Sequence, residues 1–298
     1  MCRILAYLGS PIPLDQLLLK PDHSLLVQSY APKELEVALL NADGFGLGWY
    51  RSGEMPDGVP TGEAPFTYRN ILPMWNDGNL PNLCRYVRSH SFVSNVRSAT
   101  PGLPLDFSNC QPFQHGNLLF IHNGYIERFR QTLYRPVRDL IGDTAYQNIY
   151  GLTDSEHIFA LLTHQLEAQP GLDLADGMAQ TLNILKTLAD KDGVRVSGSI
   201  VVSTGDRLVA ARFDNQAKAP TMYWLDNHPD YSGGFILASE PLFDADWTPF
   251  PQSHILSVQW EGLPLDDAQV DGAQPGRLRS HRVKPNLKRH THALTLAI

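Results

Sequence analysis

The chain opens with Met1-Cys2-Arg3-Ile4-Leu5-Ala6-Tyr7-Leu8-Gly9, and this stretch decides how the rest is interpreted. Residues 4–9 form a short apolar run that is typical of a buried strand. No charged stretch, long hydrophobic segment or cleavage site precedes it, so the sequence predicts no leader peptide. If Met1 is removed, Cys2 carries a thiol nucleophile beside a free α-amine, which is a base. A cysteine beside a core strand is by itself more typical of simple burial, so the interpretation depends on the other motifs.

Composition describes a globular chain. Its 298 residues are 43% hydrophobic and 18% charged, which fits one large domain or two ordinary ones and excludes a disordered chain. No stretch approaches the ~18–20 apolar residues that a membrane span requires. The net charge is −7, yet residues 277–298 hold six Lys or Arg and no acid. The acidic remainder argues against nucleic-acid binding, and we interpret the basic end as a solvated tail or an edge strand.

Cysteine and histidine usage argues against a disulfide framework and against a metal site. The three cysteines, Cys2, Cys84 and Cys110, are too few for a framework, and a cytoplasmic location is predicted. Cys84 falls on one face of a predicted helix and is expected in the core; Cys110 receives no role. His157 and His164 share a helix, but their spacing places them about 10 Å apart, too far for one zinc ion. We therefore expect no metal and no cofactor.

The pattern along the chain predicts strands, then two long helices, then strands again. This order indicates packed sheets with helical outer layers in one domain. Alternate glycines within residues 41–50 should let another backbone or a ligand approach one face of that strand. The predicted strands are 4–9, 41–50, 66–69, 91–97, 118–121, 196–203, 208–213, 221–225, 234–239 and 254–260, and the predicted helices are 14–19, 79–88, 154–166 and 174–188.

Three polar positions stand at the ends of predicted elements. Arg97 ends a strand. Asn123-Gly124 follows another apolar strand, where Asn-Gly is by itself typical of a hairpin turn. Asp154 lies in the first turn of a helix that begins with a capping box at Thr153, and the helix dipole alone could explain a carboxylate there.

Together with Cys2, this combination resembles the class II glutamine amidotransferases, which are N-terminal-nucleophile hydrolases. The resemblance extends from Cys2 to Trp247, and its fold would be α+β, a four-layer αββα sandwich with two antiparallel sheets face to face. Residues 1–275 would form the catalytic domain and residues 276–298 the basic C-terminal tail or edge segment. The segments that carry the resemblance are Met1–Arg3, Asn41–Tyr50, Asn95–Thr100, His122–Gly124, Thr153–Glu156 and Ala238–Pro241.

The resemblance also implies a role for each site residue. Cys2 sulfur would attack the γ-carbonyl of a γ-glutamyl amide, with its own α-amine as base. The Asn123 amide and the Gly124 N–H would form the oxyanion hole. Arg97 would bind the substrate α-carboxylate and Asp154 the α-ammonium. Ser98 is a further substrate-binding candidate, because it replaces the Trp of synthase members and leaves room for a leaving group larger than ammonia.

Within the family, residues 2–9, 25–32 and 41–44 resemble the stand-alone branch that removes glutamate from γ-glutamyl-hercynylcysteine sulfoxide in ergothioneine biosynthesis. Tyr30, Trp49 and Trp247 would then offer aromatic faces to a trimethylammonium group. The alternatives are a glutaminase subunit, another γ-glutamyl hydrolase of the glutathione-related kind, and an inactive binding or scaffold protein on the same fold. The partner expected is a small-molecule substrate, with neither nucleic acid nor membrane, and a homo-oligomer is left open.

Overall fold

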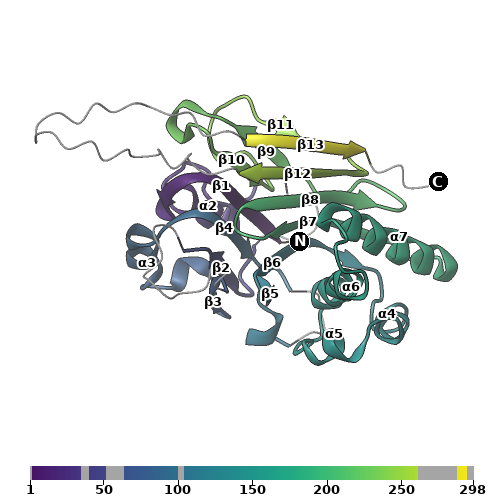
Figure 1. Ribbon diagram of the computed structural model, residues 1–298. Helices are drawn as coiled ribbons and strands as arrows, with labels where there is room; N and C mark the ends of the chain where they lie inside the picture. The colour runs from purple at the N-terminus through teal and green to yellow at the C-terminus, as the bar shows by residue number, and fades with distance from the viewer. Residues whose placement is uncertain (1, 35–39, 52–63, 100–103, 261–286, 294–298) are drawn as a thin grey trace, which may run out of the picture.

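Two antiparallel sheets form the centre of the protein, as the computed structural model in Figure 1 shows; it describes residues 2–34, 40–51, 64–99, 104–260 and 287–293. The seven-stranded sheet has the order β11-β9-β10-β1-β4-β2-β3 and the six-stranded sheet the order β13-β12-β8-β7-β6-β5. The first comprises β1 (Arg3–Pro13), β2 (Phe45–Trp49), β3 (Phe66–Asn70), β4 (Arg88–Val96), β9 (Tyr223–Asp226), β10 (Phe235–Ala238) and β11 (Thr248–Pro249). The second comprises β5 (Phe113–His115), β6 (Leu118–Ile126), β7 (Val196–Ser203), β8 (Arg207–Asp214), β12 (His254–Trp260) and β13 (Leu287–Ala293).

Helices cover the outer face of each sheet, which confirms the predicted αββα sandwich. Short helices pack against the seven-stranded sheet, and a second group, which contains the long helices α6 and α7 beside two short ones, covers the six-stranded sheet (Figure 1). The first group is α1 (Asp15–Leu18), α2 (Leu25–Tyr30) and α3 (Leu80–Tyr86), and the second is α4 (Tyr134–Leu140), α5 (Asp143–Gln147), α6 (Asp154–Ala168) and α7 (Leu174–Asp192). Single 3₁₀ turns occur at η1 (Met74–Asn76), η2 (Phe107–Asn109) and η3 (Pro229–Tyr231).

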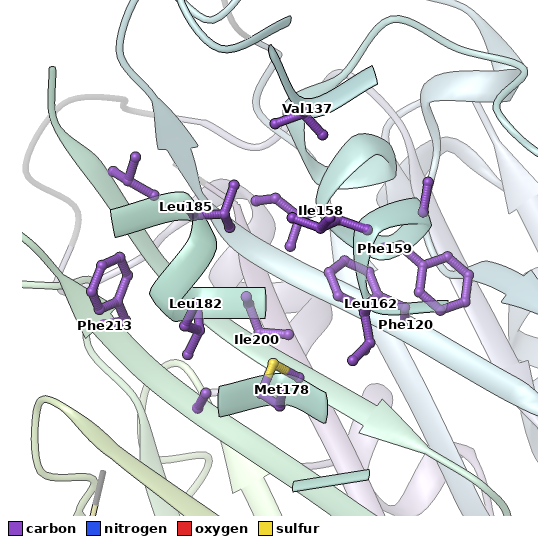
Figure 2. Packing of buried hydrophobic residues seen from close by; sticks show 14 of the residues in the cluster. Phe120, Val137, Ile158, Phe159, Leu162, Met178, Leu182, Leu185, Ile200 and Phe213 are labelled. Atoms are coloured by element: carbon purple, nitrogen blue, oxygen red, sulfur yellow. The ribbon is translucent and has the colours of Figure 1, made fainter. Parts of the chain in front are cut away.

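Three apolar layers hold the sandwich together. Figure 2 shows the layer beneath the long helices, where Met178 and Leu182 of α7 and Ile158 of α6 pack near Ile200 of β7. A second layer lies between the two sheets and includes Ile4 of β1. The third lies beneath the short helices and contains Cys84, which is fully buried as predicted. The hydrophobic effect therefore acts on four sheet faces at once.

Strand β1 is central in its sheet and sets the geometry at its N-terminal end. It pairs with β10 on one side and with β4 on the other. Ile4 belongs to the layer between the sheets and Leu5 to the layer beneath the short helices, as the alternation of a strand requires. The next inward position before Ile4 is Cys2. The alternation thus directs Cys2 between the sheets and Arg3 toward the helices.

The predicted close approach at the alternate glycines of β2 is confirmed. A Cβ on Gly46 would overlap the Gln111 carbonyl oxygen, and one on Gly48 would lie 2.8 Å from a Leu119 methyl. The segment around Gln111 and the strand β6 therefore lie directly against β2.

Three local expectations were wrong or incomplete. Asn123-Gly124 is not a hairpin turn, because β6 continues to Ile126 in register with β7. The first strand does not end at residue 9 as predicted, because β1 passes through a register shift and runs to Pro13. The sequence pattern also missed β5, α4 and α5, which are short. The predicted boundary at residue 275 lies outside the described residues, although the backbone of residues 287–293 forms β13 at the sheet edge.

Candidate active site

Cys2 lies beside Arg97 at one end of the seven-stranded sheet. Arg3 is paired with Val96, so the antiparallel register brings Cys2 opposite Arg97. The Cys2 thiol donates to the Ser98 carbonyl oxygen at 3.9 Å, and Cys2 is only partly buried. The structure therefore brings together three of the predicted residues. Met1 lies outside the described residues, and its removal stays a prediction.

Arg97 is held mainly through its backbone. Its N–H donates to the Gly44 carbonyl oxygen at 2.8 Å, and its own carbonyl accepts from Asp43 N–H at 3.0 Å. The guanidinium donates to the Asp43 carbonyl oxygen at 3.2 Å, its one hydrogen bond to the described residues. A guanidinium has five donors, and Arg97 is only 4% exposed. Most of its donors thus have no acceptor in the described part of the chain.

Asn123 reaches the same region from the opposite sheet. It shares the inward face of β6 with Leu119 and Ile121, which pack between the sheets. Leu119 lies beside Gly48, and Gln111, which bonds to His122, lies beside Gly46. From residue 119 to residue 123, β6 therefore runs alongside β2 in the direction from Gly48 to Gly46. This direction leads to the end of the seven-stranded sheet at which β1 begins.

The Asn123 side chain has no hydrogen-bond partner among the described residues. It is fully buried, and neither its amide nitrogen nor its oxygen is bonded. A buried amide without a partner costs about 1–3 kcal/mol, so such groups are rare unless a ligand completes them. Asn95, which faces the same layer opposite Ile4 and had no predicted role, has no partner among the described residues either.

Gly124 supplies a backbone N–H on the open edge of β6. The N–H groups of residues 122, 124 and 126 point to the same side, away from β7. Gln111 Oε1 accepts from His122 N–H at 2.6 Å, and Asp154 Oδ2 accepts from Ile126 N–H at 2.7 Å. The Gly124 N–H, which lies between those of His122 and Ile126, has no acceptor among the described residues.

The reason for glycine at this position is steric. A Cβ on Gly124 would overlap the Ser197 carbonyl oxygen and His122 Nε2, and one on the paired Gly198 would also meet His122 Nε2. The His122 ring thus occupies the space above the two glycines. Burial lowers the pKa of His122 below its ordinary value, partly opposed by the Asp154 charge and a hydrogen bond to the Ser197 backbone.

Asp154 joins helix α6 to strand β6. Besides binding Ile126, its carboxylate accepts from Ser155 N–H at 2.7 Å and from the Ser155 hydroxyl at 3.3 Å. The helix-start role considered from the sequence is therefore present. A carboxylate has about four acceptor positions, and Asp154 is only partly buried. It retains capacity for one more donor.

Sequence reasoning missed the polar cluster that holds the start of β1. Arg3 donates through Nε to Glu240 Oε1 at 2.7 Å and through Nη1 to the Cys2 carbonyl oxygen at 3.0 Å. His23 Nε2 lies 2.7 Å from Glu240 Oε2. The segment containing Glu240 stood out in the sequence, but its contact with Arg3 could not be read from it, because 237 positions separate the two residues.

Of the three aromatic residues suggested for recognition of the leaving group, Trp49 and Trp247 pack against other aromatic rings. Trp49 stacks on Phe66 and Trp247 packs against Phe243, both against the outer layer of the seven-stranded sheet. Tyr30 alone among the three is well exposed, at 45%. A cavity of about 650 Å³ opens near Arg69 and Glu156. Cys2, Arg97, Asn123 and Asp154 do not line it.

Metal-binding clusters and membrane-spanning helices are both absent from the described residues. These residues contain no group of three His, Cys, Asp or Glu side chains that could hold a metal ion. Within the same residues, no helix is long and apolar enough to cross a membrane.

The αββα sandwich defines the class: it is the fold of the N-terminal-nucleophile hydrolases. The chain belongs to the class II glutamine amidotransferases, since the family model described as "Glutamine amidotransferases class-II" matches residues 22–233. Proteins of this family are amidotransferases and hydrolases, so the protein is an enzyme of that family.

Curated relatives and solved structures agree with this assignment. The γ-glutamyl-hercynylcysteine sulfoxide hydrolase of Mycobacterium tuberculosis is 32% identical over 266 residues, which cover 89% of this chain and 96% of the relative. A Saccharomyces cerevisiae protein named probable glutamine amidotransferase DUG3 is 30% identical, covering 89% and 84%. A class-II domain protein from Silicibacter pomeroyi superimposes with a TM-score of 0.61 at 26% identity, covering 86% of this chain and 94% of that one.

Proposed function

We propose that the protein is a γ-glutamyl amide hydrolase with Cys2 as its nucleophile, and that its substrate is γ-glutamyl-hercynylcysteine sulfoxide. The observation that carries the reaction type is the buried Asn123 amide, which has no partner among the described residues and approaches the Cys2 end from the facing sheet. An unused, preorganised donor in a water-poor layer is what an oxyanion requires.

The reaction proceeds in two stages. Cys2 sulfur bonds to the carbon of the γ-carbonyl group while the thiol proton passes to the Cys2 α-amine, and the carbonyl oxygen takes negative charge between the Asn123 amide and the Gly124 N–H. The C–N bond then breaks and the leaving amine takes the proton. Water attacks the resulting thioester, which releases glutamate and restores the thiol.

The glutamyl group is fixed by both of its charges. Arg97 binds the α-carboxylate through donors that described residues leave unused, and Asp154 binds the α-ammonium with its remaining acceptor capacity. The Ser98 carbonyl oxygen keeps the Cys2 thiol beside this clamp.

The substrate assignment is supported by the name of the Mycobacterium tuberculosis relative, which matches nearly its whole length. The second candidate is a glutaminase or another γ-glutamyl hydrolase, which the name of the yeast relative favours. We propose a cytoplasmic location, where the three free cysteines would stay reduced.

The first test is the N-terminal mass combined with Cys2→Ala. The active enzyme should lack Met1, and Cys2→Ala should lower activity by more than about 10³-fold while the fold is kept. Cys84→Ala is the matched control, since this thiol is buried beneath the short helices and its loss should leave turnover unchanged. Full activity with Met1 retained would refute the mechanism.

The second test is a competition between γ-glutamyl-hercynylcysteine sulfoxide and glutamine. The sulfoxide should have a kcat/KM at least about tenfold higher, equivalent to ~1.4 kcal/mol. Equal or faster hydrolysis of glutamine would reject the sulfoxide as the substrate and favour a glutaminase activity.

A further inference from the structure

The Glu240 carboxylate is the centre of a buried cluster directly behind the nucleophile. Arg3 and Glu240 are 0% and 1% exposed at their side chains, and His23 is 7% exposed. The carboxylate accepts hydrogen bonds from the Arg3 and His23 side chains. It also accepts from Lys33 N–H at 2.8 Å and from Glu34 N–H at 3.1 Å. Four donors occupy about all the acceptor positions that a carboxylate offers.

The cluster keeps its charges despite burial. Burial would raise the pKa of the Glu240 carboxyl, but hydrogen bonds from His23, Lys33 and Glu34 and the Arg3 charge outweigh it and hold the pKa below its ordinary value. Because an ionised carboxylate only accepts, the His23 hydrogen lies on Nε2. The ion pair is thus complete before any substrate binds.

The cluster is connected to Cys2 by one contact. Arg3 Nη1 donates to the Cys2 carbonyl oxygen at 3.0 Å. Ile4, which follows Arg3, is fixed as well. Its N–H donates to Ser239 Oγ and its carbonyl oxygen accepts from Ser239 N–H, each at 3.0 Å. A chain terminus is ordinarily mobile unless such contacts hold it.

We propose that Arg3, fixed by Glu240 and His23, is a positioning residue for the Cys2 nucleophile. The fork of its guanidinium spans from Glu240 to the Cys2 carbonyl, which sets the orientation of the terminal residue about the start of β1. Lys has no such fork. This inference rests on Cys2 being the nucleophile, but it does not depend on which γ-glutamyl amide is the substrate.

The test compares Arg3→Lys with wild type on glutamine and on any better γ-glutamyl substrate. We expect kcat to fall about 10–100-fold with KM changed less than about twofold, since misplacement by ~1 Å can cost about 10²-fold. Inactivation by a diazoketone analogue of glutamine, which must occupy the glutamyl site, should slow by the same factor. Alkylation of Cys2 by iodoacetamide, which needs no such alignment, should change less than about threefold.

Two further variants keep the test decisive. Glu240→Gln retains the side-chain shape but loses the charge that orients Arg3, and it should show the same kcat-specific loss; it serves if Arg3→Lys fails to fold. Arg207→Lys alters an ion pair of the same length, Arg207 Nη1 to Asp173 Oδ2 at 2.7 Å, at the end of the six-stranded sheet opposite to Asn123, because Leu208 pairs with Ser203 and Ser203 with Leu119. It should leave kcat unchanged.

The outcomes separate this inference from the proposed function. Folded Arg3→Lys and Glu240→Gln with kcat within about threefold of wild type would overturn the positioning role, while loss of activity in Cys2→Ala would still support the nucleophile. Equal slowing of the diazoketone and iodoacetamide reactions would also overturn it, because a general loss of structure affects both. Activity retained in Cys2→Ala would instead refute the proposed function itself.

Discussion

Two buried polar groups of the candidate site, the Glu240 carboxylate beside β1 and the Asn123 amide on β6, differ in how completely they are hydrogen-bonded. On the β1 side, each Glu240 oxygen is bonded and Arg3 is engaged in two directions. On the β6 side, the Asn123 amide has no partner among the described residues, although it is equally buried. A nucleophile has to be oriented before the substrate arrives, whereas an oxyanion donor has to stay free until charge develops. An unsatisfied buried group can therefore mark a position that awaits a ligand, and Asn95 of β4 and Arg3 Nη2 show that such groups also occur in the seven-stranded sheet.

The largest effect should come from removing the free amide. Asn123→Ala should lower kcat/KM by about 10²–10³-fold without lowering the melting temperature, because no hydrogen bond to described residues is lost. Ser199→Ala, opposite Asn123 on β7, is the contrast: its hydroxyl donates to Pro220 O at 3.1 Å. That change should reduce stability and leave kcat/KM within about threefold. Full activity in Asn123→Ala would remove the distinction between the two sides.

Arg97 and Asp154, which would bind the two charges of the glutamyl group, should also differ: one change should affect binding alone and the other both binding and stability. Arg97→Lys should raise KM for γ-glutamyl substrates about 10–100-fold, through loss of a bidentate contact, with little change in thermal stability. Asp154→Asn should impair binding and also lower the free energy of unfolding by ~1–3 kcal/mol, because its two oxygens accept from Ile126 and Ser155. Steady-state kinetics and chemical denaturation measure the two effects. An Asp154→Asn variant that is destabilised yet binds normally would make this residue structural only.

Mild acid should weaken the β6 side first. Burial lowers the pKa of His157 on α6 from 6.5 to about 4. In the folded protein the neutral ring donates through Nδ1 to the Thr153 carbonyl oxygen and accepts through Nε2 from Arg138. Between these values the unfolded chain binds a proton that the folded chain does not, so stability falls as pH falls. The loss should be ~2 kcal/mol from pH 8 to pH 5, measured by urea titration and reduced in His157→Gln.

Glu240 titrates in a different range. Its pKa lies below the ordinary 4.5 of a glutamate, so the stability it contributes is present above that value and is lost only as pH falls through its lower folded-state pKa. A protein whose stability stays constant from pH 8 to pH 5 would contradict this order of acid sensitivity.

The smallest effect is expected at Ser98. The Cys2 thiol donates to its carbonyl oxygen, which alanine retains. Ser98→Ala should therefore change kcat/KM less than about threefold for glutamine. A larger loss confined to bulky γ-glutamyl substrates would show that the hydroxyl contacts the leaving group.

The sequence predicted most elements because their patterns were local. The alternation at β4 and the capping residues at α6 arise from side chains within one segment, and Thr153 does accept from Glu156 N–H. The same Glu156, however, reaches back to Tyr150 and Gly151 instead of closing the box at Thr153. Local pattern thus located the helix start but not the partners of its carboxylate.

The site was predictable as a set of residues but not as a network. Asn123-Gly124 carries the signal of a turn, and only the His122 ring above the paired glycines shows why the strand continues. The contact of Arg3 with Glu240 depends on tertiary pairing between β1 and β10. No periodicity along the chain encodes such a contact.

The steric closure at Gly124 has a consequence for mutational tolerance. A library sorted for folded protein alone should discard side chains at Gly124, because a Cβ there would meet Ser197 and His122. At Asn123 the same sort should accept small apolar residues, because no described group depends on the amide. Two adjacent positions of the proposed oxyanion hole would then be maintained by different selections, one for folding and one for turnover. Inactive but stable descendants should accordingly lose the asparagine and keep the glycine.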